Sequence, residues 1–269
     1  MNAPSSFQAA TPFDSIAESY DRTFTESFVG RSQRNLVWRE MDQVFRPGQR
    51  VLEINCGTGV DAAHLAQRGA RVFACDASSA MIRVARQRAA SMGLGERIEF
   101  HTMPTEEIQK LSKMPPFDGL LSNFAGLNCV LNLESVVQGL AHILKPGAYA
   151  LFCIFGKYCA WEMLWNAGRG DLRKAFRRLR NATEIYSIDG QRLHVNYWSI
   201  GQLQRAFSRY FRLKRQIGLG IVVPPSYLES LTTRFPAIFR AAAKVDRSIS
   251  SFPVFRSLAD HALLIFERS

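Results

Sequence analysis

Long hydrophobic runs are absent from this sequence of 269 residues. No segment reaches the roughly 18 apolar residues that a membrane-spanning helix requires. The first residues also lack a basic stretch followed by an apolar one, so the sequence predicts no secretory signal peptide. We therefore expect a cytoplasmic protein.

Cysteine is scarce as well. The five cysteines are scattered, their number is odd, and none forms a Cys-x-x-Cys pair with the spacing of a metal site. This pattern excludes a disulfide-rich secreted domain and predicts reduced thiols. It indicates neither a metal centre nor a nucleophilic cysteine beside a matched histidine.

Acidic residues are few in the second part of the chain. Residues 1–156 contain 15 Lys or Arg and 15 Asp or Glu, whereas residues 157–269 contain 19 and 8, so the second part carries the whole net charge of +11. Such a surface is typical of contact with an acidic substrate, an anionic membrane or nucleic acid, or simply of a soluble surface.

Short apolar strands alternate with helical patterns in the first part. The sequence predicts strands at 50–55, 70–76, 97–103, 116–124 and 148–155, and helices at 61–69, 78–93 and 133–147. Strands separated by helices form βαβ units in a mostly parallel sheet with right-handed crossovers.

The pattern changes after Phe155. Residues 159–182 indicate one broken helix or two short ones, and 184–199 indicate a hairpin around Asp189 and Gly190. A helix at 200–210, a strand at 211–223, a proline-broken helical stretch at 224–250 and a last strand at 260–268 follow.

We therefore predict an α/β fold, with a Rossmann-like seven-stranded mostly parallel sheet, helices on both faces and an antiparallel last strand. A helical and hairpin insertion follows the fifth strand. The expected parts are amino-terminal lid helices and a cofactor-binding core over residues 1–155, a basic lid or substrate insertion over 156–200, and residues 201–269 that complete the same core.

A glycine turn follows the first strand. Gly57 and Gly59 lie where a ligand can approach the backbone at a helix amino terminus, and the string GTGVDA also fits a dinucleotide fingerprint. Glu53, just before the turn, suits an ammonium group and would repel a pyrophosphate. Asp76 ends the second strand, where an acid accepts hydrogen bonds from a ribose diol. A ligand with both groups is S-adenosylmethionine.

The same residues resemble the first motif of the class I S-adenosylmethionine-dependent methyltransferases, in which an acid precedes a glycine-rich turn. The family often has glycine where this chain has Asn55. The strings FDGLLSNFAGLN and ILKPGAYALF resemble the family's fourth-strand motif and the turn into its fifth strand. FDSIAESYD resembles its amino-terminal lid helix. These motifs cover about residues 13–155.

The resemblance implies a role for each residue of a cofactor site. Tyr20 would close over the cofactor, Glu53 would hold the methionine ammonium, and Asp76 would hold the ribose hydroxyls. Met81 would cover part of the adenosine or pack in the core. Backbone near Met103 and Thr105 would contact adenine, and Phe124 would stack on adenine or pack in the core. The implied set is Tyr20, Glu53, Asn55, Cys56, Gly57, Thr58, Gly59, Asp76, Ala77, Met81, Pro104, Thr105, Asn123 and Phe124.

The sequence indicates no catalytic base. Asn123 ends the fourth strand, where its amide would position an acceptor or cap the turn, and Asn128 is interpreted as a cap. His194 lies on the hairpin face opposite Leu193 and Val195, which favours a surface role. The remaining histidines are interpreted as structural.

The basic insertion allows two main interpretations. Leu172, Phe176 and Leu179 are spaced to share one helix face, and arginines cover the rest. Such a helix can pack its apolar face on the core as a lid with its arginines in solvent, the interpretation we favour, or it can lie on an anionic membrane. Nucleic-acid binding is disfavoured because Trp161 and Trp165 precede the charged run instead of alternating with it.

The predicted function is methyl transfer from S-adenosylmethionine to a small-molecule substrate, with acidic and lipid-like acceptors as candidates. The alternatives are an RNA methyltransferase, an NAD-dependent oxidoreductase and a non-catalytic cofactor-binding protein. The acceptor atom and the oligomeric state are left open.

Overall fold

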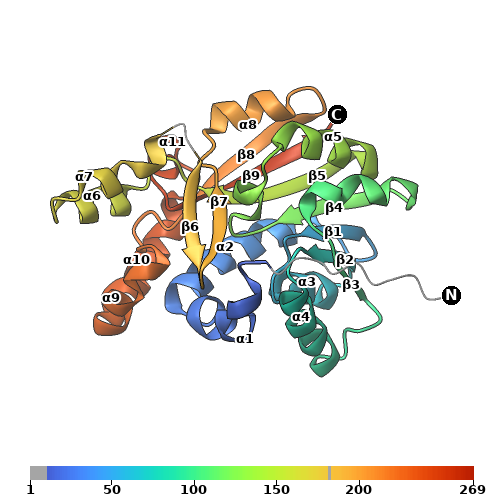
Figure 1. Ribbon diagram of the computed structural model, residues 1–269, viewed down its shortest axis with the longest axis horizontal. Helices are drawn as coiled ribbons and strands as arrows, with labels where there is room; N and C mark the ends of the chain where they lie inside the picture. Colours follow the sequence, from blue (N-terminus) through green and yellow to red (C-terminus); the bar gives the residue numbers. More distant parts are fainter. Residues whose placement is uncertain (1–10, 181–182) are drawn as a thin grey trace.

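Seven strands form one sheet through the middle of the protein (Figure 1). The computed structural model describes residues 11–180 and 183–269. The strands lie in the order β3-β2-β1-β4-β5-β9-β8, and β9 runs antiparallel to both of its neighbours. This arrangement confirms the predicted fold. The strands are β1 (Arg50–Ile54), β2 (Arg71–Asp76), β3 (Ile98–Thr102), β4 (Phe117–Ser122), β5 (Leu144–Phe155), β8 (Phe211–Leu219) and β9 (His261–Arg268).

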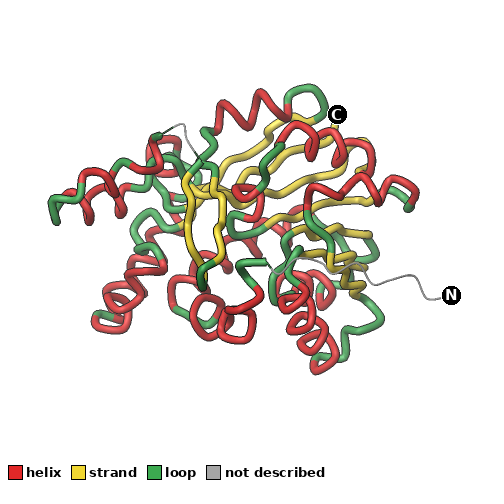
Figure 2. Tube along the Cα trace, in the orientation of Figure 1, coloured by secondary structure: helices red, strands yellow, loops and turns green. Residues whose placement is uncertain are grey.

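Helices cover both faces of the sheet because successive residues of its strands point to opposite sides (Figure 2). In β1, Leu52 and Ile54 pack with η3 (Thr105–Lys113), α5 (Leu133–Ile143) and α8 (Ile200–Phe207). Val51 packs on the other side with α2 (Phe28–Val44), α3 (Val60–Gln67) and α4 (Ser79–Ser91). The same alternation places Glu53 on the side of α2 and α3.

The amino-terminal segment folds against the start of α4. It consists of η1 (Asp14–Ile16), α1 (Ala17–Tyr20) and η2 (Asp21–Thr25). Ala17, Ala80 and Met81 form a small buried cluster, with Phe13 and Tyr20 packed against it. The segment therefore lies close to the carboxyl ends of β1 and β2.

The insertion after β5 contains short helices and a separate hairpin. The elements are α6 (Ala160–Ala167), α7 (Leu172–Ala175), η5 (Arg177–Leu179), β6 (Glu184–Ile188) and β7 (Gln191–Val195). The hairpin turns at Asp189 and Gly190, whose φ angles are 50° and 80°, as its tight two-residue turn requires. This confirms the predicted hairpin and the two short helices.

The favoured lid interpretation of the basic helix is wrong in its detail. The chain breaks after α7, so residues 172–179 do not form one helix. Leu172 and Phe176 are exposed instead of packing on the core, whereas Arg178 is buried and Arg177 is half-buried. Both arginines form ion pairs with buried acidic side chains. The helical spacing of apolar residues, on which the prediction rested, does not reveal these ion pairs.

A second helical group lies between β8 and β9. It contains η6 (Ser226–Leu228), α9 (Glu229–Arg234), α10 (Pro236–Ile249) and α11 (Pro253–Arg256), and α10 begins with a proline, as helices often do. Among residues 11–180 and 183–269, no helix has the length and hydropathy needed to span a membrane.

Candidate functional site

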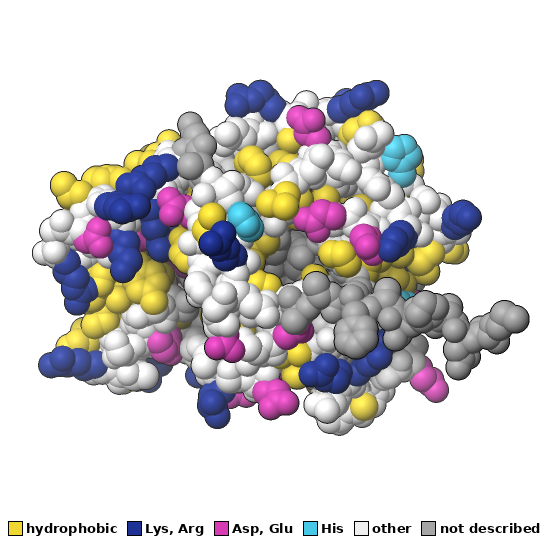
Figure 3. All heavy atoms as spheres, in the orientation of Figure 1, with side chains coloured by type: hydrophobic (Ala, Val, Ile, Leu, Met, Phe, Trp, Pro, Cys, Tyr) yellow, Lys and Arg dark blue, Asp and Glu magenta, His cyan; other side chains and the backbone are white. Residues whose placement is uncertain are grey.

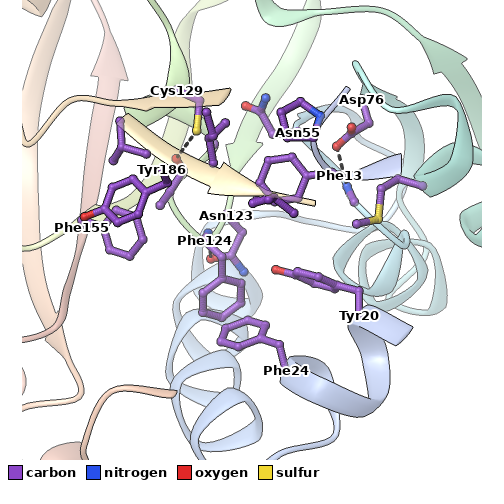
Figure 4. A pocket seen from close by; sticks show the side chains of 18 of the residues that line it. Phe13, Tyr20, Phe24, Asn55, Asp76, Asn123, Phe124, Cys129, Phe155 and Tyr186 are labelled. Carbon is purple, nitrogen blue, oxygen red and sulfur yellow. Dashed lines mark hydrogen bonds between the residues drawn. The ribbon is translucent and has the colours of Figure 1, made fainter. Parts of the chain in front are cut away.

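A cavity of about 790 Å³ opens at the carboxyl ends of β1, β2 and β4, beneath the amino-terminal segment and the hairpin. This edge of a doubly wound sheet is where such folds bind ligands. Figure 4 shows Asn55 and Asp76 at one end of the cavity and Phe155 and Tyr186 at the other. We call these the turn end and the hairpin end.

Most of the predicted cofactor-site residues meet at this cavity. Glu53 and Gly59 do not line it, and they lie behind its wall. The other twelve line it: Tyr20, Asn55, Cys56, Gly57, Thr58, Asp76, Ala77, Met81, Pro104, Thr105, Asn123 and Phe124.

The glycine turn uses three left-handed residues. Asn55 has φ 56°, Gly57 53° and Gly59 73°. Asn55 replaces glycine here because its side chain fixes the conformation: Nδ2 donates to Thr105 Oγ1 at 2.9 Å, and Oδ1 accepts from Ser122 at 3.1 Å. A Cβ on Gly59 would meet Ala85 of α4 at 2.8 Å, so this glycine permits close packing of the turn on α4.

Asp76 holds the turn from the neighbouring strand. Its Oδ2 accepts from the backbone N–H of Gly57 at 2.9 Å, and its Oδ1 accepts from that of Ser78 at 2.8 Å. Burial raises the pKa of this carboxyl, and the two backbone donors act against that rise. Each oxygen keeps a free lone pair, so a diol in the cavity has acceptors available.

Glu53 is buried beside a second acid, Asp61. It is 1% exposed, and its Oε2 has no hydrogen-bond partner among the described residues. Burial raises its pKa well above the ordinary value, and the charge of Asp61 raises it further, whereas Arg34 lowers it. A buried carboxylate without a partner favours a cationic ligand nearby.

Asp61 is the centre of a network that the sequence did not predict. Its carboxylate accepts from Arg34 at 2.5 Å, from Trp38 Nε1 at 2.6 Å and from Asn123 Nδ2 at 2.8 Å. Asn123 Oδ1 accepts from the backbone N–H of Phe124. The Asn123 amide therefore holds the turn, as one predicted alternative had it. Its Nδ2 carries a second hydrogen, so a role in positioning an acceptor stays a prediction.

An aromatic wall joins the two ends of the cavity. The ring of Phe124 lies 4.9 Å from that of Phe24 and 5.9 Å from that of His261, and the guanidinium carbon of Arg34 lies 4.6 Å from its centroid. Phe124 and Ala125 both have positive φ, which is strained for residues other than glycine. This strain turns the Phe124 ring into the cavity (Figure 4).

The hairpin end combines aromatic side chains with an internally paired charge cluster. Arg178 donates to Glu162 at 3.0 Å, to Asp260 Oδ1 at 2.8 Å and to two backbone carbonyls. Arg177 donates to both oxygens of Glu162. The hydroxyls of Tyr186 and Tyr197 are hydrogen-bonded at 2.7 Å. Two cations thus face two anions.

His261 lies between this cluster and Phe124. It is 5% exposed, and its ring stands 4.8 Å from that of Phe155. Its Nδ1 is 3.1 Å from Asp260 Oδ2, although the geometry is not that of a hydrogen bond. His261 was predicted to be structural, but its place at the start of β9, opposite Phe155 of β5, brings it to the cavity.

The other predicted side chains lie as follows. His194 is exposed and Leu193 and Val195 line the cavity, so the predicted alternation is confirmed. Asn128 is not a cap: it is buried, donates to Asn196 O at 2.6 Å and accepts from the backbone N–H of Phe155. It ties the exit of the hairpin to β5.

Neither a disulfide nor a metal cluster is found in the described part of the chain. All five cysteines are free, and four are buried. Within residues 11–180 and 183–269, no three His, Cys, Asp or Glu side chains are grouped to hold a metal ion.

In sequence, the family match lies over the sheet core. The sequence profile of the family described as "Methyltransferase domain" matches residues 51–147. Demethylmenaquinone methyltransferase of Clavibacter sepedonicus is 34% identical over 156 residues, which are 55% of this chain and 58% of that protein. The tRNA 5-carboxymethoxyuridine methyltransferase of Escherichia coli K12 is 31% identical over 139 residues, 50% of this chain and 52% of that protein.

The chain thus matches little more than half the length of these relatives. The solved structure of the CcbJ methyltransferase from Streptomyces caelestis shares the fold, with a TM-score of 0.61 and 14% identity over 97% of this chain and 98% of that one. The strand order, the acid before the glycine turn and the acid after β2 agree with these likenesses, and residues 51–147 match a methyltransferase domain.

Proposed function

We propose that the protein transfers a methyl group from S-adenosylmethionine to a small, uncharged acceptor that carries an ionisable hydroxyl or amine. The observation that carries the proposal is a single cavity with two chemically different ends. The turn end offers carboxylates, and the hairpin end offers aromatic rings and a buried histidine. The two ends meet at Phe124, two residues after the end of β4.

The residues at the turn end fit this cofactor. The unpartnered Oε2 of Glu53 supplies an acceptor for an ammonium group, and Arg34, whose Nε is also without a partner among the described residues, supplies a donor for a carboxylate. Asp76 offers acceptors to a ribose diol, and Phe13 and Met81 offer apolar contacts. When bound, S-adenosylmethionine supplies an electrophilic methyl group.

The hairpin end supports an uncharged acceptor. Arg177 and Arg178 are the cations that line it, and Glu162 and Asp260 compensate both. An anionic acceptor would gain little from arginines that already hold carboxylates, because their donors are used. The aromatic rings of Phe155, Tyr186 and Tyr197 favour a planar or lipid-like group.

His261 is the side chain best placed to receive the acceptor's proton. A hydroxyl or amine must lose its proton when its oxygen or nitrogen is methylated, and a buried imidazole is the commonest general base in proteins. The Asp260 carboxylate lies 3.1 Å from its Nδ1, on one side of the ring. The burial of both groups helps to exclude water from the reaction.

Calorimetry with S-adenosylhomocysteine tests the cofactor part of the proposal. We expect binding in the micromolar range, about −8 kcal/mol, and no binding of NADH. Asp76→Ala should weaken binding by about tenfold or more because a hydrogen bond to a charged acceptor contributes about 1.5–3 kcal/mol. Asp118→Ala, at the other end of the sheet, is the control. Binding of NADH but not of the thioether would overturn the assignment.

An assay that follows transfer of a labelled methyl group identifies the acceptor. Purified protein is incubated with labelled S-adenosylmethionine and phenols, quinols, amines, their carboxylated analogues, or bulk tRNA. We expect transfer to the uncharged compounds. Transfer to tRNA alone, the substrate named for the Escherichia coli relative, would contradict a small acceptor.

A further inference from the structure

Exposed apolar side chains gather on the helices that follow β5 and β8. Leu164 of α6 is 75% exposed, Ile238 of α10 is 63% exposed and Val254 of α11 is 70% exposed. Most of the large exposed apolar residues in the described part of the chain lie between Tyr158 and Leu258: Tyr158, Leu164, Leu172, Phe176, Ile185, Tyr227, Phe235, Ile238, Val245, Phe252, Val254, Phe255 and Leu258.

Helix α10 shows how this exposure is organised. One face of the helix packs against the rest of the protein, since it buries Phe239, Ala242 and Asp246. Ile238 and Val245, two turns apart, lie on the outer face. The helix therefore has a second apolar stripe that nothing in the described chain covers.

The helices form one continuous end of the molecule. Trp161 of α6 packs in one cluster with Phe239 and Ala242 of α10, and the backbone N–H of Ala160 donates to Leu258 O, just after α11. Figure 1 shows α6, α7, α9 and α10 at the same end of the protein, away from β3. We call the outer surface of α6, α7, α9, α10 and α11 the helical end.

The helical end is basic as well as apolar. Residues 160–180 and 229–256 contain eleven Lys or Arg and four Asp or Glu. Glu162 and Asp246 are buried, and Glu229 accepts from the backbone of α2, so Asp171 is the acid that stays exposed. Figure 3 shows dark blue basic side chains interspersed with yellow apolar ones at this end.

The basic side chains of α10 have no acidic partners. Arg240, Lys244 and Arg247 are exposed, and among the described residues none forms an ion pair. Positive charge flanking a row of protruding aliphatic and aromatic side chains is the pattern of helices that lie in the interface of an anionic bilayer. A nucleic acid would bind the basic side chains but would gain nothing from the exposed aliphatic ones.

We propose that the helical end docks the protein on the surface of an anionic lipid bilayer. The apolar side chains of α10 and α11 enter the interface, and the basic side chains contact lipid phosphates. The proposal does not rest on methyl transfer. It also places the cavity close to the membrane, because Pro225 and Tyr227, which precede α9, line the hairpin end.

Vesicle sedimentation tests the proposal with the full chain. Vesicles of phosphatidylcholine alone are compared with vesicles that also contain phosphatidylglycerol, in low and high salt. We expect binding to the anionic vesicles that weakens with salt. Ile238→Ser with Val245→Ser, and separately Arg240→Glu with Lys244→Glu, should each weaken partitioning by about tenfold or more.

Matched controls come from the opposite end of the molecule. Met92→Ser and Arg83→Glu remove an exposed apolar and an exposed basic side chain of α4 or its end, and we expect both to leave partitioning unchanged. Binding of S-adenosylhomocysteine by each variant shows that it is folded, independently of the vesicles.

Three results would overturn the proposal. The first is wild-type protein that ignores anionic vesicles. The second is equal loss in the α4 controls. The third is a dimer in solution, seen by light scattering, that the α10 variants convert to a monomer with no change in vesicle binding, because a second copy of the chain would then cover the helical end.

Discussion

Burial of the Glu53 carboxyl group lowers the free energy of unfolding of the protein without its cofactor. Its pKa is raised above the ordinary value of 4.5, chiefly by burial, so the folded state keeps a proton that the unfolded state loses. Between those two pKa values the unfolded state binds fewer protons, and stability falls as pH rises. Glu53→Gln removes this dependence.

We therefore expect Glu53→Gln to be more stable than the wild type at pH 8, by a margin that shrinks toward pH 4.5. The same variant should bind S-adenosylhomocysteine about tenfold more weakly, since the charge facing the ammonium is lost. Urea denaturation at several pH values and calorimetry check the two effects. A variant that loses stability and binds the thioether normally would show that Glu53 is structural.

His261 is the second residue whose role can be separated from folding. His261→Gln should lower kcat by about a hundredfold, within the range for loss of a general base, with unchanged affinity for S-adenosylhomocysteine. His194→Gln, exposed on the hairpin, is the control and should have wild-type kcat. Equal activity of the two variants would remove His261 from the chemistry.

At the scale of elements, η2 fastens the amino-terminal segment to the turn. Asp21 Oδ1 accepts from Thr58 Oγ1 at 2.7 Å, its Oδ2 pairs with Arg88, and Arg88 donates in turn to Thr58 O. Because Tyr20 precedes Asp21, these contacts hold its ring over the cavity.

Asp21→Ala should loosen this closure. We expect about a fivefold loss of affinity for S-adenosylhomocysteine, on the order of 1 kcal/mol for the lost hydrogen bonds. Limited proteolysis should cut the segment before α2 faster than in the wild type. Asp42→Ala, which removes a pairing with His64 and Arg68 on the outer side of α3, controls for loss of an ion pair. A proteolysis rate equal to that of the control would argue against the fastening.

The predicted and observed elements agree where the spacing of apolar residues within one segment is enough to identify a strand or a helix. Strand and helix patterns located β1 to β5, and the Asp189-Gly190 turn located the hairpin. Helix α2 is absent from the predicted elements, although Leu36, Val37 and Met41 have helical spacing. Glu53, Gly57 and Asp76 were identifiable because one local motif contains or flanks each of them.

The hairpin end was not predictable in this way. Arg178 and Asp260 are 82 positions apart, and Glu162 reaches them from another helix. Nothing local to Arg178 distinguishes it from Arg173, which is exposed. His261 likewise gains its environment only when β9 pairs with β5. Both environments arise from contacts between distant parts of the chain, and the local spacing of apolar residues does not reveal such contacts.

For the whole molecule, Arg178 is the link between the insertion and the sheet. Burial alone would raise the pKa of Asp260, but the nearby His261 and Arg178 hold it below its ordinary value of 3.8. A lowered folded-state pKa contributes stability that is present above about pH 3.8 and lost as pH falls through the folded value.

Arg178→Ala should destabilise the protein by about 3–5 kcal/mol at neutral pH, since buried Asp260 loses its arginine and buried Glu162 keeps only Arg177. The loss should shrink in acid, where Asp260 becomes protonated. Arg173→Ala should change the free energy of unfolding by no more than about 0.5 kcal/mol. Chemical denaturation of both variants at several pH values decides whether the pairing holds the insertion in place.

The place of β9 has a consequence for how the protein is made. It is the last strand in chain order, yet it lies between β5 and β8. While the chain is being synthesised, β1 to β5 can assemble, but β8 has no neighbour, and the edge of β5, with Leu151, Phe152 and Cys153, stays uncovered. A ribosome stalled before His261 would therefore expose an apolar strand edge, and a nascent chain of this protein should depend on chaperones until β9 emerges.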